Sequence, residues 1–379
     1  MPLGLYVHFP FCRNACSYCD FYKELHAADA ESSFYAALKR ETTLAADELE
    51  VYDREISTIF IGGGTPSLTN VPLLSDWLQQ LKKHFAVPSG IEFTIECNPE
   101  SVTLESLRAF MELGINRPIF GIQSFDPRLL GLLHRRHDPH QSHRSVYYAN
   151  ALGFRNFGVD LIFGLPGQTS KMLSADLDQL VDLEPPHISF YQLTVEAGTP
   201  LAAMVASGAV KPPDPELAMA MYRGGCERLA EAGYRRYEVS SFARPGFECR
   251  HNLRYWEGGD YLGLGPSAHS FIDGRRFANV SNIEKYMTLL DGDTLPRIAD
   301  ESGIEHRMYE AIMLGLRTSR GISRADFSER FGVPVEARLN REQYCLLIES
   351  GHLLPDGKSL RLSDEGILVA NEITRRLID

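Results

Sequence analysis

Short apolar runs alternate with amphipathic segments along roughly the first 240 residues of the chain. The apolar runs are rich in β-branched and aromatic residues and predict six strands, at residues 5–9, 56–62, 91–97, 117–123, 157–163 and 187–193. Helical spacing lies between them, at residues 31–47, 71–84, 104–113 and 170–183. This alternation indicates an α/β fold with parallel strands and right-handed crossovers. Six such units favour a barrel or partial barrel over an open sheet.

The pattern changes after residue 240. Residues 241–300 are rich in glycine, aromatic residues and histidine and show little periodicity. Residues 301–379 predict three helices, a short hairpin and a closing helix, an order typical of a small winged-helix module. We therefore expect three parts: a barrel over residues 1–240, a connecting segment over residues 241–300, and a C-terminal helical domain over residues 301–379.

Charge argues against nucleic acid as a partner. The chain has a formal net charge of −12, and residues 301–379 contain 11 basic and 13 acidic residues. A winged helix that binds DNA would carry a basic stripe, so we expect a structural or docking role for this module. The chain has no apolar run near the roughly 20 residues that span a bilayer and no secretory leader pattern. Three of its seven cysteines crowd into eight residues, which indicates metal or redox use in the cytoplasm.

Cys12, Cys16 and Cys19 follow the first predicted strand with the spacing C-x3-C-x2-C. Thiolates hold iron–sulfur clusters, usually four of them. Three thiolates would leave one iron open, and an open coordination position lets a metal centre bind a substrate. The pattern therefore predicts a [4Fe–4S] cluster whose open iron exchanges S-adenosylmethionine (SAM), as in a radical SAM protein. A zinc site with His8 as its fourth ligand and three unrelated buried cysteines are the competing interpretations.

Glycine and polar residues follow the predicted strands. The segment GGGTP at residues 62–66 comes directly after the second strand, and its glycines allow close approach of the backbone to a ligand. Parallel barrels gather their sites at the carboxyl ends of the strands. We therefore expect several strand-end side chains near the cluster, namely Glu96, Asn98, Gln123, Ser124, Asp160, Gln192 and Thr194. Arg135 is either a partner for a carboxylate in the same mouth or a solvated helix cation.

The segments CRNACSYCDF, GGGTPS, ECNPE, GIQSF, DLIFGLPGQT and HNLRYW, in this order, resemble the HemW/HemN branch of radical SAM proteins. The resemblance covers almost the whole chain. It implies a radical SAM partial (β/α)6 TIM-type barrel with a small C-terminal helical, winged-helix-like domain. It also implies that Tyr6, Gly63 and Glu96 contact cluster-bound SAM. Further positions match a second SAM site of the oxygen-independent coproporphyrinogen III oxidases: Tyr18, Gly64, Thr65, Gln123, Arg135 and Asp160.

Two features separate this sequence from the oxidases of that branch. The oxidases have a further cysteine two residues after the third, where this chain has Phe21. They also have a long N-terminal extension, whereas eleven residues precede Cys12 here. Both differences resemble HemW, the branch described as haem chaperones.

The segment HNLRYW matches the H-N-x-x-Y-W motif that this resemblance associates with haem, so His251, Asn252, Tyr255 and Trp256 are expected to bind haem. An imidazole can bind haem iron, and the two aromatic side chains offer flat apolar faces to a porphyrin. A structural His–Asn turn packed by two aromatic rings is the alternative interpretation. His269 is a second candidate haem ligand.

We therefore expect a haem chaperone that binds haem and a SAM-ligated [4Fe–4S] cluster and transfers haem to acceptor proteins, without coproporphyrinogen oxidase activity. The expected partners are haem, haem-acceptor proteins and an electron donor for the cluster. We expect a cytoplasmic monomer or homodimer that associates peripherally near membrane haem proteins. Oxidative decarboxylation of coproporphyrinogen III and a radical SAM reaction on haem itself are the alternative functions, and no catalytic residue is assigned.

Overall fold

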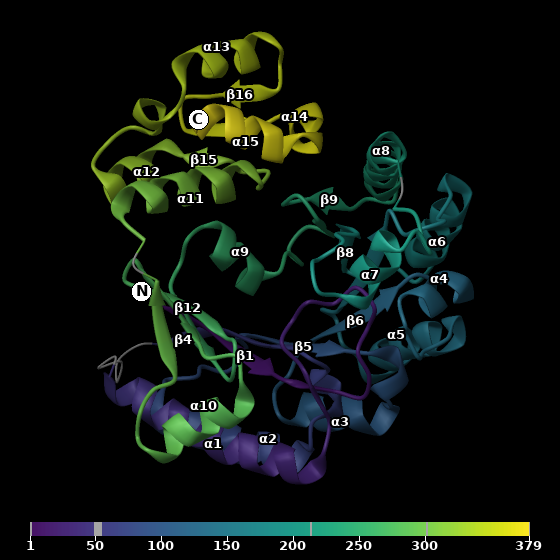
Figure 1. The fold of residues 1–379 in the computed structure, drawn as a ribbon, viewed down its shortest axis with the longest axis vertical. Coiled ribbons are helices and arrows are strands. Elements are labelled where there is room, and N and C mark those ends of the chain that lie inside the picture. Colours follow the sequence, from purple (N-terminus) through teal and green to yellow (C-terminus); the bar gives the residue numbers. More distant parts are fainter. Residues whose placement is uncertain (1, 49–54, 213, 301, 379) are drawn as a thin grey trace.

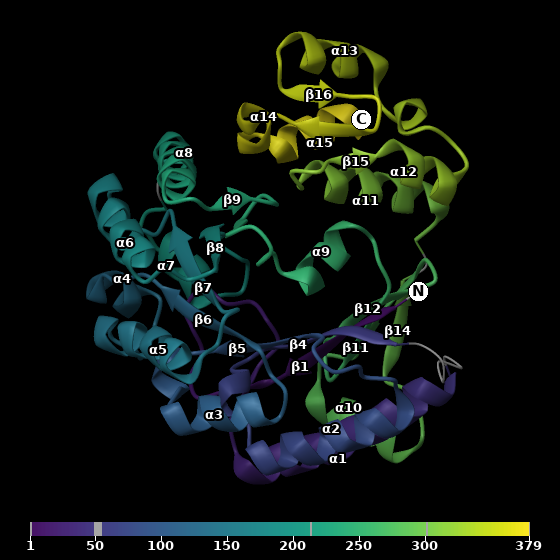
Figure 2. The ribbon, with the colours of Figure 1, turned by 180° about the vertical axis from the view of Figure 1, so that it is seen from behind.

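A single curved sheet organises the molecule (Figure 1). The computed structural model describes residues 2–48, 55–212, 214–300 and 302–378. Within these residues the main sheet has 12 strands, in the order β14-β13-β12-β11-β1-β4-β5-β6-β7-β8-β10-β9. Its concave face points toward the C-terminal part of the chain in both views (Figures 1 and 2).

The six central strands are parallel and form the predicted partial (β/α)6 barrel. They are β1 (Leu3–Phe9), β4 (Ile56–Gly63), β5 (Glu92–Cys97), β6 (Arg117–Gln123), β7 (Gly158–Phe163) and β8 (His187–Gln192). Each matches a predicted strand to within two residues at either end. The long apolar runs identify them because strands covered on both faces bury almost every side chain.

Helices cover the convex face of this barrel (Figures 1 and 2). They are α1 (Ala28–Glu48), α2 (Val71–His84), α3 (Leu104–Glu112), α4 (Pro127–Leu132), α5 (Pro139–Leu152), α6 (Ser170–Asp182), α7 (Pro200–Ala206) and α8 (Pro215–Glu231). Local sequence sets their starts. Thr103 begins α3 with a capping box to Ser106, and Asn70 caps α2 ahead of a proline in its first turn. Short 3-10 turns follow β4 and β5, at Pro66–Leu68 and Pro99–Ser101.

The segment expected to connect the barrel to the C-terminal domain also extends the main sheet. It contributes β10 (Ser241–Ala243), β11 (Tyr261–Leu264), β12 (His269–Ile272), β13 (Arg275–Asn279) and β14 (Arg297–Asp300), while β9 (Arg235–Arg236) ends the opposite edge. β11 pairs with β1 in parallel, and β12 to β14 continue antiparallel. The segment also carries α9 (Arg250–Trp256) on the concave face and α10 (Ile283–Asp291) beside α1.

A buried carboxylate ties α1 to this extension. Glu41 accepts hydrogen bonds from the Tyr286 hydroxyl at 2.6 Å, the Gly265 N–H at 2.8 Å and the Asn279 amide at 2.5 Å. Burial raises the pKa of Glu41 to about 7, although these donors favour the charged form. The edge of the sheet and α10 are therefore held to the barrel through a group that titrates near neutrality.

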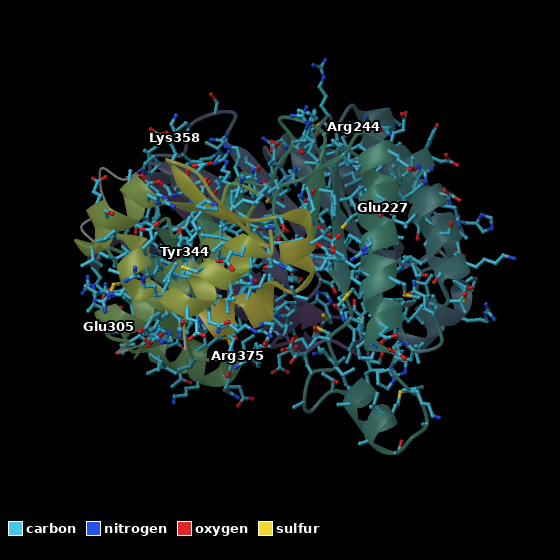
Figure 3. The ribbon with its side chains drawn as sticks, turned by 90° about the horizontal axis from the view of Figure 1, so that it is seen from above. Glu227, Arg244, Glu305, Tyr344, Lys358 and Arg375 are labelled. Atoms are coloured by element: carbon cyan, nitrogen blue, oxygen red, sulfur yellow. The ribbon has the colours of Figure 1, made fainter. Side chains whose placement is uncertain are left out.

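The C-terminal module has the predicted winged-helix order. Its elements are α11 (Ile304–Leu316), β15 (Ile322–Ser323), α12 (Arg324–Phe331), a 3-10 turn (Val335–Arg338), α13 (Arg341–Glu349), the wing β16 (Leu353–Pro355) and β17 (Ser359–Leu362), and then α14 (Asp364–Leu368) and α15 (Ala370–Ile378). Figure 3 shows the module, marked by Tyr344 and Arg375, beside the column of α8, marked by Glu227. No helix among the described residues is long and apolar enough to cross a bilayer.

The module docks onto the concave side of the barrel. α11 packs against α9, and the Ser319 N–H donates to the Tyr237 carbonyl at 2.9 Å. Two ion pairs with exposed carboxylates add to the contact, Arg223–Glu365 and Arg236–Asp364. The module and the sheet therefore enclose α9 between them.

Glu41 makes stability depend on pH with a defined sign. Because its pKa is raised on folding, its contribution to stability is fully present below pH 4.5 and falls as the pH rises toward about 7. We expect Glu41→Gln to flatten the free energy of unfolding over this window by on the order of 3 kcal/mol. Urea unfolding at a series of pH values measures it, with Glu112→Gln on the exposed face of α3 as the control. A profile for Glu41→Gln that parallels the unmodified protein would rule this assignment out.

Candidate functional site

A cavity of about 1380 Å³, its open mouth included, lies at the carboxyl ends of the parallel strands. One wall is the loop after β1, where β2 (Phe11–Cys12) pairs with β3 (Glu24–Leu25) and folds the loop back on itself. Cys12, Cys16 and Cys19 all line the cavity. So do eight of the nine expected SAM contacts, namely Tyr18, Gly63, Gly64, Thr65, Glu96, Gln123, Arg135 and Asp160. The structure therefore brings these sequence-distant residues to one place.

Polar groups from separate segments surround the three cysteines. Thr65 Oγ1 lies 3.4 Å from Cys12 Sγ, Arg135 Nη1 lies 3.7 Å from Cys16 Sγ, and Lys23 Nζ lies 2.8 Å from the Cys19 carbonyl oxygen. Burial raises the pKa of the Cys12 and Cys19 thiols, while the ammonium of Lys23 acts in the opposite direction. The cationic side chains of Lys23 and Arg135 therefore lie where they can offset the negative charge of thiolates.

A single metal ion does not suit this arrangement. Across the described ranges, no group of three His, Cys, Asp or Glu side chains lies close enough to hold one ion. His8, the expected fourth zinc ligand, is 4% exposed, and its ring nitrogens lie 3.2 Å from the Tyr6 hydroxyl and 2.9 Å from the Tyr22 carbonyl oxygen. The geometry therefore disfavours the zinc interpretation.

The glycine-rich turn after β4 is fixed to the cysteine loop by backbone hydrogen bonds. The Gly64 N–H donates to the Phe9 carbonyl at 2.7 Å, and the Thr65 N–H donates to the Phe11 carbonyl at 2.8 Å. A Cβ at Gly64 would lie 2.7 Å from the Phe11 carbonyl oxygen, so no larger residue fits. Gly63 has φ +105°, a conformation that glycine adopts without strain. The turn and the cysteine loop therefore form one rigid rim.

Two half-buried carboxylates, Glu96 and Asp160, line the cavity. Burial and the nearby charge of Asp160 raise the pKa of Glu96 to about 8, against a hydrogen bond from the Gly63 N–H at 3.2 Å. Burial likewise raises the pKa of Asp160 to about 6. A positively charged ligand would favour the ionised form of both groups.

Several buried polar atoms of the cavity lack a protein partner. Within the described residues, Asp160 Oδ1, Gln123 Oε1 and Arg135 Nε make no hydrogen bond. Buried polar atoms are nearly always paired, so an unpaired set around one cavity indicates a polar ligand. Gln123 also has φ +69°, a strained conformation of the kind that clusters at functional sites. These features fit SAM, which carries an ammonium, a carboxylate and a sulfonium.

Tyr6 is the one expected SAM contact that does not line the cavity. Its ring packs at 6.2 Å from Phe60, between centroids, and its hydroxyl meets His8. Burial, followed by the charge of Glu96, raises the pKa of Tyr6. Tyr6 therefore belongs to an aromatic layer beside the cavity.

The haem motif lies elsewhere, on α9. The ring of His251 is fully buried, with Nδ1 at 2.8 Å from Thr58 Oγ1 and Nε2 at 2.7 Å from the Tyr255 hydroxyl. It packs against Phe60 with 5.3 Å between ring centroids, and burial lowers its pKa to about 3. In this conformation both ring nitrogens are engaged, as in the structural alternative for this motif.

The other expected haem residues are more accessible. Tyr255 and Trp256 line a separate cleft between the sheet edge and α11, Asn252 is half-buried, and His269 is exposed at the start of β12. None of the haem-motif residues lines the cysteine cavity.

Sequence reasoning missed the residue that positions α9. Glu92 on β5 is 5% exposed and accepts the N–H of Arg250 at 2.9 Å and of His251 at 2.8 Å, so it caps the helix. A charged residue within an apolar strand was the available signal. Ser124, expected at the cavity, instead donates to buried Asp176 at 2.7 Å.

Comparison with known proteins agrees with this geometry. Residues 6–180 match the Radical SAM superfamily, and residues 305–369 match the HemN C-terminal domain. Coproporphyrinogen III oxidase (HemN) from Escherichia coli, described as a radical SAM enzyme, superposes with a TM-score of 0.85 at 23% identity, over 100% of this chain and 90% of its own. Fold and cavity thus define a radical SAM protein, a class that implies a [4Fe–4S] cluster and SAM.

Curated relatives of similar length show to which family of radical SAM proteins the chain belongs. The Heme chaperone HemW of Mycobacterium tuberculosis is 36% identical over 100% of this chain and 95% of its own length. That of Escherichia coli is 33% identical over 98% and 97%. The mitochondrial Radical S-adenosyl methionine domain-containing protein 1 of Bos taurus is 36% identical over 99% and 87%. The chain belongs to the HemW family.

Asp160 Oδ1, which makes no hydrogen bond among the described residues, yields a matched test. We expect Asp160→Asn to weaken SAM binding about tenfold, the effect of losing one charge-assisted hydrogen bond, without loss of stability. Asp176→Asn should instead lower the free energy of unfolding by about 1–3 kcal/mol and leave SAM affinity unchanged, because Asp176 bonds only within the protein fold. Anaerobic calorimetric titration measures the affinity. Equal SAM affinity for Asp160→Asn and the unmodified protein would exclude Asp160 as a contact.

Proposed function

We propose that this protein is a haem chaperone, which binds haem and passes it to acceptor proteins. The observation that carries the proposal is similarity along the full chain to proteins named Heme chaperone HemW. Phe21 is consistent with it: this residue stands where the oxidases are expected to have a further cysteine, and its side chain is 64% exposed beside the cavity.

Cys12, Cys16 and Cys19 would hold the [4Fe–4S] cluster. Three thiols on one cavity wall, with no single-ion geometry among the described residues, suit a cluster in which each thiolate binds a different iron. Lys23 and Arg135 would offset the negative charge of the thiolates. When bound and reduced, such a cluster supplies one electron to the sulfonium of SAM.

SAM would exchange through the open mouth of the cavity. Gly63, Gly64 and Thr65 form a rim on which a ligand can lie close to the backbone. Glu96 and Asp160 would attract the ammonium and sulfonium, and Arg135 and Gln123 would pair with polar groups of the ligand. The unpaired atoms in the described part of the cavity belong to Asp160, Gln123 and Arg135. Binding of a second SAM in this cavity stays a prediction.

The haem ligand follows from accessibility. Ligation by His251 requires breaking its hydrogen bonds to Thr58 and Tyr255 and withdrawing it from a buried site. His269 is exposed and requires no such change. We therefore favour His269 over His251 as the first ligand to haem iron. An external electron donor, a cytoplasmic location, association near membrane haem proteins and a monomeric or dimeric state stay predictions.

The function is tested by transfer. Haem-loaded protein mixed with apo-myoglobin should pass its haem to the acceptor, so that the Soret spectrum becomes that of holo-myoglobin. This transfer should be faster than the spontaneous release of haem from the loaded protein into buffer. In parallel, reconstituted protein incubated without oxygen with SAM, dithionite and coproporphyrinogen III should form no protoporphyrinogen. Its formation, together with failed transfer, would replace the chaperone by the oxidase.

The ligand is tested by a pair of histidine variants. We expect His269→Ala to lose most of the Soret band in a haemin titration while it keeps its unfolding temperature, because His269 is exposed. His251→Ala should lower the free energy of unfolding by about 2–4 kcal/mol, because it opens a cavity and leaves Thr58 and Tyr255 without a partner. The reverse result, a Soret loss confined to a folded His251 variant, would mean that α9 moves on binding.

A further inference from the structure

Arg135 follows a left-handed turn at the end of α4. His134 has φ +55° there, a conformation that residues other than glycine rarely adopt. The His134 N–H donates to the Gly131 carbonyl at 3.1 Å, and the Arg135 N–H donates to the Leu130 carbonyl at 2.9 Å. These two bonds form a Schellman motif, which ends the helix and fixes the direction in which the chain leaves it. His134 and Arg136 are exposed, whereas Arg135 between them lines the cysteine cavity.

The cysteine loop is fastened to the same turn. The buried Ser17, within this loop, donates its N–H to the Leu133 carbonyl at 3.1 Å and its hydroxyl to the Leu132 carbonyl at 2.8 Å. The Asn14 side-chain amide donates to the His134 carbonyl at 2.9 Å. The loop that carries the cysteines and the turn at the end of α4 are therefore held in one fixed arrangement.

The guanidinium of Arg135 is held by three acceptors. Its Nη1 lies 3.7 Å from Cys16 Sγ, and its Nη2 donates to Asn98 Oδ1 at 2.7 Å and to the Gly121 carbonyl at 2.6 Å. Its Nε is the guanidinium nitrogen that has no partner among the described residues. Most of the guanidinium is therefore engaged by the protein itself, and one end of it is directed at a cysteine sulfur.

A carboxylate and a buried imidazole stand behind Asn98. Asn98 Nδ2 donates to Glu100 Oε1 at 3.3 Å, and Glu100 Oε2 lies 3.4 Å from Nδ1 of His137, which is itself buried. Burial acts to raise the pKa of Glu100, but the neighbouring His137 and Arg135 outweigh it and lower this pKa. The ionised carboxylate thus anchors Asn98 and supplies a counter-charge that helps to keep the Arg135 guanidinium in this position.

A guanidinium on a cysteine sulfur changes how readily a cluster bound there accepts an electron. Hydrogen bonds to the sulfurs and the local charge are among the properties that set the reduction potential of iron–sulfur clusters. Reduction adds negative charge to the cluster and its thiolates, so a fixed cationic donor favours the reduced state. Lys23, the other nearby cation, donates to the carbonyl oxygens of Cys19 and Phe21 at 2.8 and 3.1 Å. Of these two cations, Arg135 is the one that contacts a sulfur.

We propose that Arg135 raises the reduction potential of the cluster through a hydrogen bond to the Cys16 thiolate, and that Asn98 is a positioning residue for this contact. The resemblance to the oxidases implied a SAM contact for Arg135, and its unpartnered Nε leaves that contact open. The role proposed here is exerted whether or not SAM is bound. It rests on the cluster of the proposed function and is independent of haem transfer.

The reduction potential of the cluster without SAM provides the test. Full-length protein is reconstituted without oxygen, and a potentiometric titration followed by electron paramagnetic resonance gives the potential. We expect Arg135→Gln to lower the potential by about 59 mV or more, a tenfold weaker one-electron reduction, because the donor to Cys16 is lost. Arg136→Gln removes the same charge at the next, exposed position and is the matched control. It should leave the potential nearly unchanged, because water and salt screen an exposed charge.

Two further variants separate position from charge. Asn98→Ala changes no charge but removes one acceptor of Nη2, so it should lower the potential in the same direction by a smaller amount. Arg135→Lys keeps the charge, but an ammonium cannot span the sulfur and both oxygen acceptors, so it should restore only part of the potential lost in Arg135→Gln. These two variants carry the test if Arg135→Gln assembles no cluster. Iron and sulfide analysis and circular dichroism show that each variant is loaded and folded.

The outcomes distinguish the inference from the function on which it rests. A loaded Arg135→Gln variant with weaker SAM binding and an unchanged SAM-free potential would mean that Arg135 serves SAM alone, which overturns the proposed contact to Cys16. An unchanged potential in Asn98→Ala, beside a lowered one in Arg135→Gln, would remove Asn98 from the positioning role. Failure of the unmodified protein to assemble a four-iron cluster would instead overturn the cluster of the proposed function.

Discussion

The buried carboxylate of Glu92 holds α9 on the concave face of the sheet, and the arrangement of the haem motif depends on that contact. It accepts two backbone N–H groups at the start of the helix, where the helix dipole favours a negative charge. From there α9 places His251 against Thr58 inside the barrel and Tyr255 and Trp256 in the wall of the cleft. The C-terminal module then packs on α9 through α11.

Several polar atoms in the cysteine cavity have no hydrogen-bond partner among the described residues. Asp160, Gln123 and Arg135 each present an unpaired atom there, and two carboxylates with raised pKa values lie beside one another. Leaving such atoms unpaired costs about 1–3 kcal/mol each. The cavity therefore suits a ligand of mixed charge, and binding of such a ligand should stabilise the barrel.

Much of this arrangement could be predicted from sequence, and the failures have physical causes. The six central strands are buried on both faces, so their apolar runs stand out, and parallel strand ends necessarily bring Glu96, Gln123 and Asp160 together. The strands β11 to β14 could not be predicted because they span only four or five residues each and three of them, β12 to β14, continue the sheet in antiparallel pairing. The burial of His251 could not be predicted from the sequence because its hydrogen-bond partner Thr58 is 193 residues away. A histidine followed by aromatic residues has the same sequence whether it faces a ligand or the protein interior.

The length of α9 has a consequence for how the molecule assembles. A helix of seven residues is too short to form alone in water, so its conformation exists only when its neighbours hold it. Those neighbours come from β5, from β11 and β12, and from α11, which together span most of the chain. The wall that Tyr255 and Trp256 form therefore depends on contacts with α11. A chain without its C-terminal module would lack this wall.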